Sequence, residues 1–140
     1  MKIFLLPALL ALGGCAAAGA GPFEAEFAPA GVQLAAGPSP ARAGGVADLS
    51  LHNGAALPVG YNLCMAALEQ FAGGLWIPAR SHAVSCPQQF ASLAPAATAN
   101  GQAPLPGSLA PGLYRFVTQL SASSENLPDV QLRGEPFRVE

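Results

Sequence analysis

The residues best suited to chemistry in this chain are its three cysteines and two histidines. Nucleophilic catalysis needs a base beside a nucleophile, and a third group that orients the base. No motif supplies such partners to His52 or His82, so we expect both to be solvated surface residues. Cys64 and Cys86 lack the CxxC spacing that is typical of zinc and redox sites. We therefore expect no catalytic residue, no metal site and no cofactor.

Acidic residues and glycines also form no pattern that predicts an active site. The eight acidic residues are dispersed, and Glu24 and Glu26 are the one close pair. Glycoside cleavage would need two carboxylates on either side of a substrate. The glycine pairs lack the strand–loop–helix context of a phosphate-binding loop. We expect the protein not to be an enzyme.

Cys15 has a different setting, at the end of an N-terminal apolar run. Lys2 gives a positive start, residues 3–12 are largely apolar, and two glycines precede the cysteine. This order is typical of a signal peptide. The run is too short to span a bilayer, which takes about 20 residues. The segment Leu12-Gly13-Gly14-Cys15 resembles a bacterial lipobox.

The lipobox resemblance implies cleavage before Cys15, a diacylglycerol on its sulfur, and often an acyl chain such as palmitate on the new amine. Residues 1–14 are then a signal peptide, residues 15–22 a flexible tether of small residues, and residues 23–140 one globular domain. The expected location is the cell membrane or the outer membrane, outside the cytoplasm. The alternative is an ordinary secreted protein in which Cys15 is incidental.

Export would place Cys64 and Cys86 in an oxidising compartment, where two cysteines are expected to pair. In the chain-entropy model, closing a loop of this length stabilises the fold by roughly 3 kcal/mol. A metal-binding pair or a catalytic thiol is the alternative. The sequence predicts a disulfide between these two residues.

The charges argue against nucleic acid as a partner. The net charge is -2, and Lys2, the one lysine, would leave with the signal peptide. The arginines of the remaining chain are scattered and form no basic run. The expected partners are the membrane, through the lipid on Cys15, and an unknown envelope protein.

Short strands separated by turns dominate the pattern of the domain. Apolar residues alternate with polar ones in several segments, and glycine and proline punctuate the whole chain. Asn53-Gly54 and Gly73-Gly74 predict tight turns. The apolar phase slips near Met65-Ala66, which predicts a bulge or a bend, with a helix over residues 63–71 as the second interpretation. Strands are predicted over residues 32–34, 45–53, 59–71, 75–77, 83–86, 89–93, 97–105, 112–121 and 135–140.

The segment Leu109-Ala110-Pro111-Gly112-Leu113-Tyr114 resembles the L-x-P-G-x-Y signature of immunoglobulin-like sandwiches. The resemblance implies a structural tyrosine corner, in which the Tyr114 hydroxyl bonds to upstream backbone. The resemblance covers roughly residues 30–140, and this part of the chain is similar to small bacterial immunoglobulin-like domains of exported proteins. The expected fold is an all-β, antiparallel, immunoglobulin-like sandwich of seven or eight short strands. Cys64 and Cys86 depart from the cysteine positions of antibody domains, so no antibody-like interface is implied.

The expected function is that of a non-enzymatic, lipid-anchored envelope protein whose immunoglobulin-like module acts in protein binding or envelope assembly. The alternative is an inhibitor of secreted proteases, from a fainter similarity to the bacterial intracellular proteinase inhibitor family. Trp76, Tyr61 and Phe71 are either an exposed binding patch or part of the core. We expect the core, because the domain has few other large side chains to fill its centre.

Overall fold

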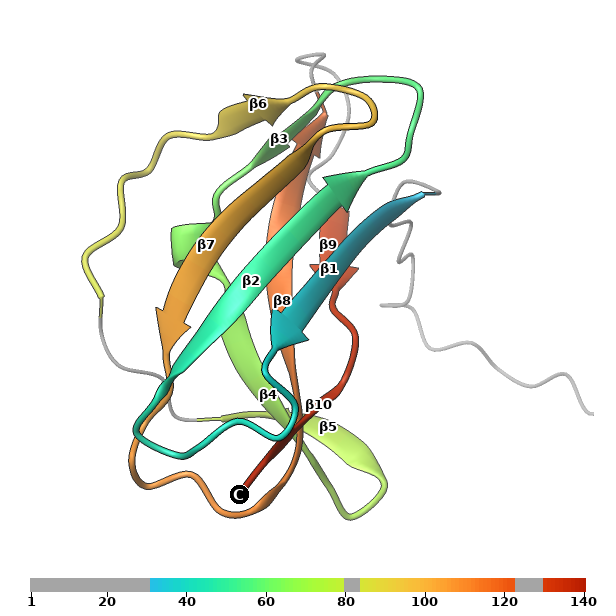
Figure 1. Ribbon diagram of the computed structural model, residues 1–140. Coiled ribbons are helices and arrows are strands. Elements are labelled where there is room, and N and C mark those ends of the chain that lie inside the picture. Colours follow the sequence, from blue (N-terminus) through green and yellow to red (C-terminus); the bar gives the residue numbers. More distant parts are fainter. Residues whose placement is uncertain (1–30, 80–83, 123–129) are drawn as a thin grey trace, which may run out of the picture.

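Ten strands and one short helical turn make up the regular structure of the residues that the structure describes. The computed structural model describes residues 31–79, 84–122 and 130–140, so Cys15 and the predicted signal peptide and tether lie outside the described residues. Along the chain (Figure 1) the elements are β1 (Val32–Gly37), β2 (Val46–Asn53), β3 (Val59–Tyr61), the 3-10 helix η1 (Leu63–Met65), β4 (Ala67–Ala72), β5 (Leu75–Pro78), β6 (Ala91–Leu93), β7 (Thr98–Pro104), β8 (Gly112–Ala122), β9 (Val130–Arg133) and β10 (Phe137–Val139).

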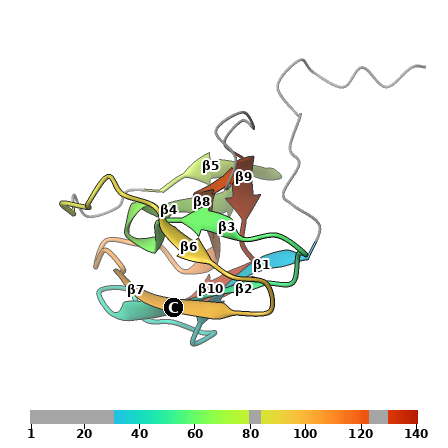
Figure 2. The ribbon, with the colours of Figure 1, turned by 90° about the horizontal axis from the view of Figure 1, so that it is seen from above.

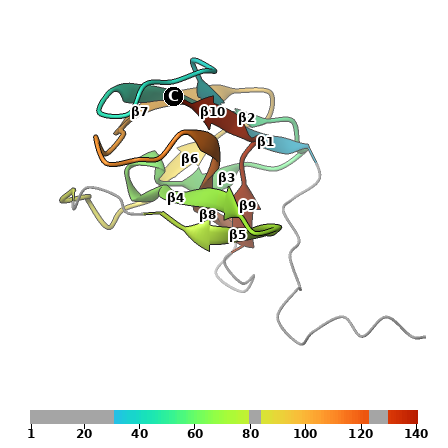
Figure 3. The ribbon, with the colours of Figure 1, turned by 90° about the horizontal axis from the view of Figure 1, so that it is seen from below.

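The strands form two antiparallel sheets packed face to face, which Figures 2 and 3 show from the two ends. The smaller sheet has three strands in the order β1-β2-β7. The larger sheet has seven, with β5-β4-β8-β3-β6 as its main path and β9 and β10 paired to β8. The predicted all-β, antiparallel class is therefore confirmed, whereas the predicted count of seven or eight strands is too low, since the described residues form ten.

The long strand β8 organises the larger sheet. Along one edge it pairs with β4 and then with β3, and along the other with β10 and then with β9. Each edge of β8 thus meets two short strands in series. The sequence pattern predicted β8 and β10 but missed β9, whose four residues are too few to show a clear alternation.

Alternating side chains from both sheets build the core. In β2, Ala47, Leu49 and Leu51 are buried, and in β8 Tyr114 and Phe116 are buried. These are the faces that the period-two pattern predicts. Full burial of one such leucine stabilises the fold by roughly 1.5–3 kcal/mol relative to exposure.

The predicted strand over residues 59–71 is interrupted. The chain forms β3, then the single turn η1, and then β4. This turn repairs the slip in apolar phase, which places Leu63 and Leu68 in the core although their positions have opposite parity. The helix considered over residues 63–71 is reduced to Leu63–Met65.

One further expectation, the strand over residues 83–86, is corrected. No strand includes residues 84–86, because this part of the chain is held by a disulfide and by side-chain bonds rather than by a sheet. The turn at Asn53-Gly54 does not join paired strands, since β2 lies in the smaller sheet and β3 in the larger one. It carries the chain from one sheet to the other.

Backbone hydrogen bonds close one side of the sandwich. The Ala41 amide donates to the Arg138 carbonyl at 2.8 Å, and the Glu140 amide donates to the Ala41 carbonyl at 2.9 Å. The Glu135 amide also donates to the carbonyl of Leu34 in β1, at 2.8 Å. The smaller sheet is therefore linked to the larger one at the β1 side, and β7 lies at its opposite edge.

Candidate binding site

Among the described residues, the side chains that could ligate a metal ion lie apart from one another. His52 lies exposed on the outer face of β2, with Nδ1 3.0 Å from the Thr98 hydroxyl. Among residues 31–79, 84–122 and 130–140, no three histidine, cysteine, aspartate or glutamate side chains are grouped as metal ligands would be. His82 lies outside the described residues.

In the part of the chain that the structure describes, no helix has the length and hydropathy of a membrane span.

The predicted disulfide is present, with the sulfur atoms of Cys64 and Cys86 2.04 Å apart. It joins η1 to the segment of residues 84–90, which precedes β6. A disulfide suggests an extracytoplasmic protein, because the cytosol keeps thiols reduced.

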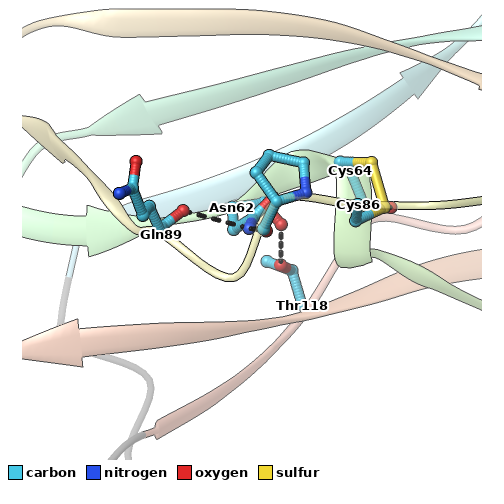
Figure 4. The surroundings of a disulfide bond; sticks show 6 residues. Asn62, Cys64, Cys86, Gln89 and Thr118 are labelled. Atoms are coloured by element: carbon cyan, nitrogen blue, oxygen red, sulfur yellow. Dashed lines mark hydrogen bonds between the residues drawn. A yellow bond between two sulfur atoms is a disulfide. The ribbon is translucent and has the colours of Figure 1, made fainter.

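Asn62 reinforces the attachment of this segment (Figure 4). Its buried side-chain amide donates to the carbonyls of Pro87, at 2.6 Å, and Gln89, at 3.1 Å. The Thr118 hydroxyl of β8 lies 3.5 Å from the Asn62 carbonyl. The segment of residues 84–90 is thus held by one covalent link and two hydrogen bonds, although it has no strand partner of its own until β6.

Tyr114 lies at the start of β8 and is fully buried. Its hydroxyl donates to the carbonyl of Ala110, four residues upstream, at 2.6 Å. This is the type of bond that the tyrosine motif implies. Burial raises the pKa of the Tyr114 phenol. The residue anchors the chain that enters β8 and lies within the core, away from the outer surfaces.

The expected core position of the three aromatic residues is wrong for Phe71 and Trp76. Phe71 is 43% exposed, and Trp76 is half-buried. Tyr61 is half-buried and packs against the core. Phe71 and Trp76 face each other across the hairpin of β4 and β5, with ring centroids 5.2 Å apart. The hairpin lies at the lower right of Figure 1.

An arginine and a glutamate complete this surface. Arg115 in β8 pairs with Glu69 in β4, and the Arg115 Nε lies 2.7 Å from a Glu69 carboxylate oxygen. The Arg115 guanidinium also lies over the Trp76 ring, 4.3 Å from its centroid, which is a cation–π distance. We call Glu69, Phe71, Trp76 and Arg115 the hairpin cluster.

The hairpin cluster lies on the outer face of the larger sheet. Its β8 member, Arg115, alternates with Tyr114 and Phe116, which point into the core. The side chains of Arg115 and Glu69 are 12% and 20% exposed, so salt screens this pair less than it screens a fully exposed one. The ion pair thus holds the guanidinium against the half-buried Trp76 ring, beside the exposed Phe71.

A hollow of about 400 Å³ adjoins the hairpin cluster on the same face. It shares Glu69 with the cluster and continues towards the segment of residues 84–90. Its other lining residues include Met65, Pro78, Phe90, Gln119 and Gln131. Met65 and Phe90 thus line the hollow together with two carboxamides, and methionine and aromatic residues are enriched where proteins contact one another.

No sequence motif distinguishes Glu69 or Arg115. The available signal was their position: Arg115 interrupts the apolar run of β8, and its parity is opposite to that of the core residues. Its partner depended on the register between β4 and β8, which follows from the interruption at η1.

The chain matches no model of a known protein family, and no curated protein matches it. Its function is therefore inferred from the geometry of the described residues.

Proposed function

We propose that this protein is a non-enzymatic, lipid-anchored envelope protein whose immunoglobulin-like module binds another protein through the hairpin cluster. The observation that carries the proposal is the half-buried Trp76 ring on the outer face, which lies between the exposed Phe71 ring and the Arg115–Glu69 ion pair. Tryptophan and arginine are the residue types most enriched at binding hot spots. Phe71 and the adjoining hollow extend this surface.

The hairpin cluster is ordered before any partner arrives. Trp76 contacts both Phe71 and Arg115, and Glu69 fixes the guanidinium. A side chain that is already held loses little rotamer freedom on binding, and such losses cost roughly 0.5–1.5 kcal/mol per mobile side chain. Preorganisation of this type favours a protein-binding role over a solvated surface with no partner.

The immunoglobulin-like part of the proposal is supported by strand order and by Tyr114. A three-stranded sheet of β1, β2 and β7 opposes a sheet in which β8 lies between β3 and β4 on one edge and β9 and β10 on the other. This order parallels the division of an immunoglobulin-like sandwich into its two sheets. The bond from Tyr114 to Ala110 is typical of the same class.

The anchor is proposed from the lipobox at Cys15, and the disulfide supports an extracytoplasmic site. Two or more acyl chains hold a protein stably at a bilayer, whereas one does so only marginally. Mass spectrometry of the N-terminal peptide from membrane-extracted protein tests this part. We expect a lipid-modified Cys15 as the first residue, and an unmodified thiol would contradict the anchor.

Co-purification after crosslinking in intact cells tests the binding role. We expect Trp76→Ala to lower recovery of the crosslinked partner at least about tenfold, since loss of a hot spot costs 2 kcal/mol or more. Leu75→Ala is the matched control. Leu75 lies on the same hairpin and is 69% exposed, but its side chain points to the face opposite Trp76 because the two residues are consecutive in β5. Equal recovery with the two variants would contradict the hairpin cluster as the binding site.

A further inference from the structure

The free edge of β7 is a second surface with a defined chemistry. Strand β7 pairs with β2 on one side and has no strand on the other, among the residues that the structure describes. Backbone groups of alternate residues point to opposite edges of an antiparallel strand. The Asn53 amide donates to Ala97 at 2.9 Å, and the Leu105 amide donates to Gly45 at 2.8 Å. Odd-numbered positions of β7 therefore bond to β2.

The even-numbered residues Thr98, Asn100 and Gln102 consequently direct their backbone N–H and C=O groups to the open edge. No hydrogen bond from the described residues meets these amides. Natural edge strands are commonly protected by charged side chains or proline. β7 contains no charged residue, and Pro104 protects only its end.

A groove of about 630 Å³ runs beside this edge. Residues 100–104 of β7 form one wall, and η1, Val84 and Cys86, which is disulfide-bonded to Cys64, form the other. Leu63, Leu68 and Phe116 from the core contribute to its lining. None of the residues that line the groove carries an ionisable side chain, because Cys64 and Cys86 are joined in a disulfide.

The open edge of β7 and the uncharged groove beside it determine which kind of segment can bind there. An extended segment on the edge of β7 would gain up to six backbone bonds, one to the N–H and one to the C=O of each of the three residues, and every second side chain would enter the groove. A charge on that side would be desolvated without a partner. A second copy of β7 is a poor occupant, because its groove-side residues are Ala99, Gly101 and Ala103, which are too small to fill the space.

We infer that β7 and the adjoining groove bind an extended, uncharged segment of a partner protein by strand addition, with larger apolar side chains at alternate positions. This site is separate from the hairpin cluster, because the two share no residue. The inference does not rest on the proposed function. The variant Trp76→Ala should leave strand addition unchanged, so either proposal can fail alone.

The test uses the full chain and two synthetic peptides. The probe is a ten-residue peptide in which valine and threonine alternate between terminal lysines, and the control replaces each valine by aspartate. Amide hydrogen exchange of Thr98, Asn100 and Gln102 is followed by NMR. We expect the valine peptide to slow exchange of these amides at least about tenfold, and the aspartate peptide to have no effect.

Gln102→Pro removes one edge donor without removing a backbone bond to β2, and it should weaken the protection of the Thr98 and Asn100 amides. Gln102→Ala is its control, because both variants lose the 2.9 Å bond from the Gln102 side chain to Asp48 and only proline loses the amide. Where the proline variant fails to fold, Val84→Asp places an unpaired charge at the groove and should weaken peptide binding at least about tenfold.

Unchanged exchange with the valine peptide would overturn the inference, as would equal protection in folded Gln102→Pro. Protection of the three amides in the free protein that rises with protein concentration would assign the edge to a second copy. Protection that is independent of concentration would assign it to another part of the same chain. Both of these results would also overturn strand addition by a partner.

Discussion

At the scale of single residues, the buried side chains of Tyr114 and Asn53 form hydrogen bonds to the backbone at two chain connections. The Tyr114 hydroxyl bonds to Ala110, and Asn53 makes three bonds at the crossing between the sheets. Each polar atom is satisfied, which is the condition for its burial at low cost. The motif around Tyr114 predicts its role, whereas Asn53-Gly54 predicts a turn but not the burial of the asparagine.

Replacing Tyr114 with phenylalanine removes its bond to the Ala110 carbonyl at nearly constant volume. We expect a loss of about 1 kcal/mol in the free energy of unfolding, measured by urea titration. Burial raises the pKa of Tyr114 in the folded state, so the folded protein holds this proton more tightly than the unfolded chain does.

The stability that this proton contributes is fully present below about pH 10, the usual pKa of tyrosine, and is lost as the pH rises through the raised pKa. The fall in stability between about pH 8 and about pH 11 should therefore be smaller for Tyr114→Phe than for the parent protein. An identical fall in both proteins would show that Tyr114 does not contribute to it.

Asn53→Leu tests the hydrogen bonds that Asn53 makes where the chain crosses from one sheet to the other. The Asn53 amide donates to the carbonyls of Leu57 and Leu93, and its oxygen accepts from the Ala55 amide, all at 3.0 Å. Leucine has a similar volume but leaves these backbone groups without partners, so we expect a loss of about 3 kcal/mol in the free energy of unfolding. The control Asn100→Leu, at an exposed position of β7, should change it by less than about 0.5 kcal/mol. Similar losses in the two variants would refute this role.

At the scale of elements, alternation predicts the strands that have one apolar face and fails where tertiary contacts decide. Strands β2 and β8 follow the pattern because every second residue is buried in the core. The break at η1 was predicted as a bulge or bend, but its form depends on bonds from Asn62 to residues about 25 positions away, which no local pattern contains. The same limit explains why the core position expected for Trp76 is wrong, since the register of the β4–β5 hairpin places this residue on the outer face.

Removal of the disulfide should release the segment of residues 84–90 more than the rest of the domain. For the double variant Cys64→Ala and Cys86→Ala we expect a loss of roughly 2–4 kcal/mol in the free energy of unfolding. Hydrogen exchange should rise most at the amides of Gln89 and β6, which adjoin the released segment. A Met65→Ala variant, exposed in the same turn, is the control. Exchange that rises uniformly through both sheets would contradict a local clamp.

At the scale of the whole molecule, the sandwich has distinct surfaces. Hydrogen bonds close the side of β1, β7 leaves the other side open, and the larger sheet presents the hairpin cluster outward. The outer face of the smaller sheet is polar, with Gln33, Asp48 and Gln102 exposed on it. Aromatic surface is thus concentrated away from the smaller sheet. The predicted lipid on Cys15 would hold this domain at a membrane.

The hairpin cluster is proposed to contact another envelope protein. A photo-crosslinking amino acid in place of Phe71, activated in intact cells, tests it most directly, with the same substitution at Gln33 as the control on the opposite sheet. The account predicts a discrete adduct with one protein from position 71 and none from position 33. The same adducts from both positions, or no adduct from position 71, would contradict it.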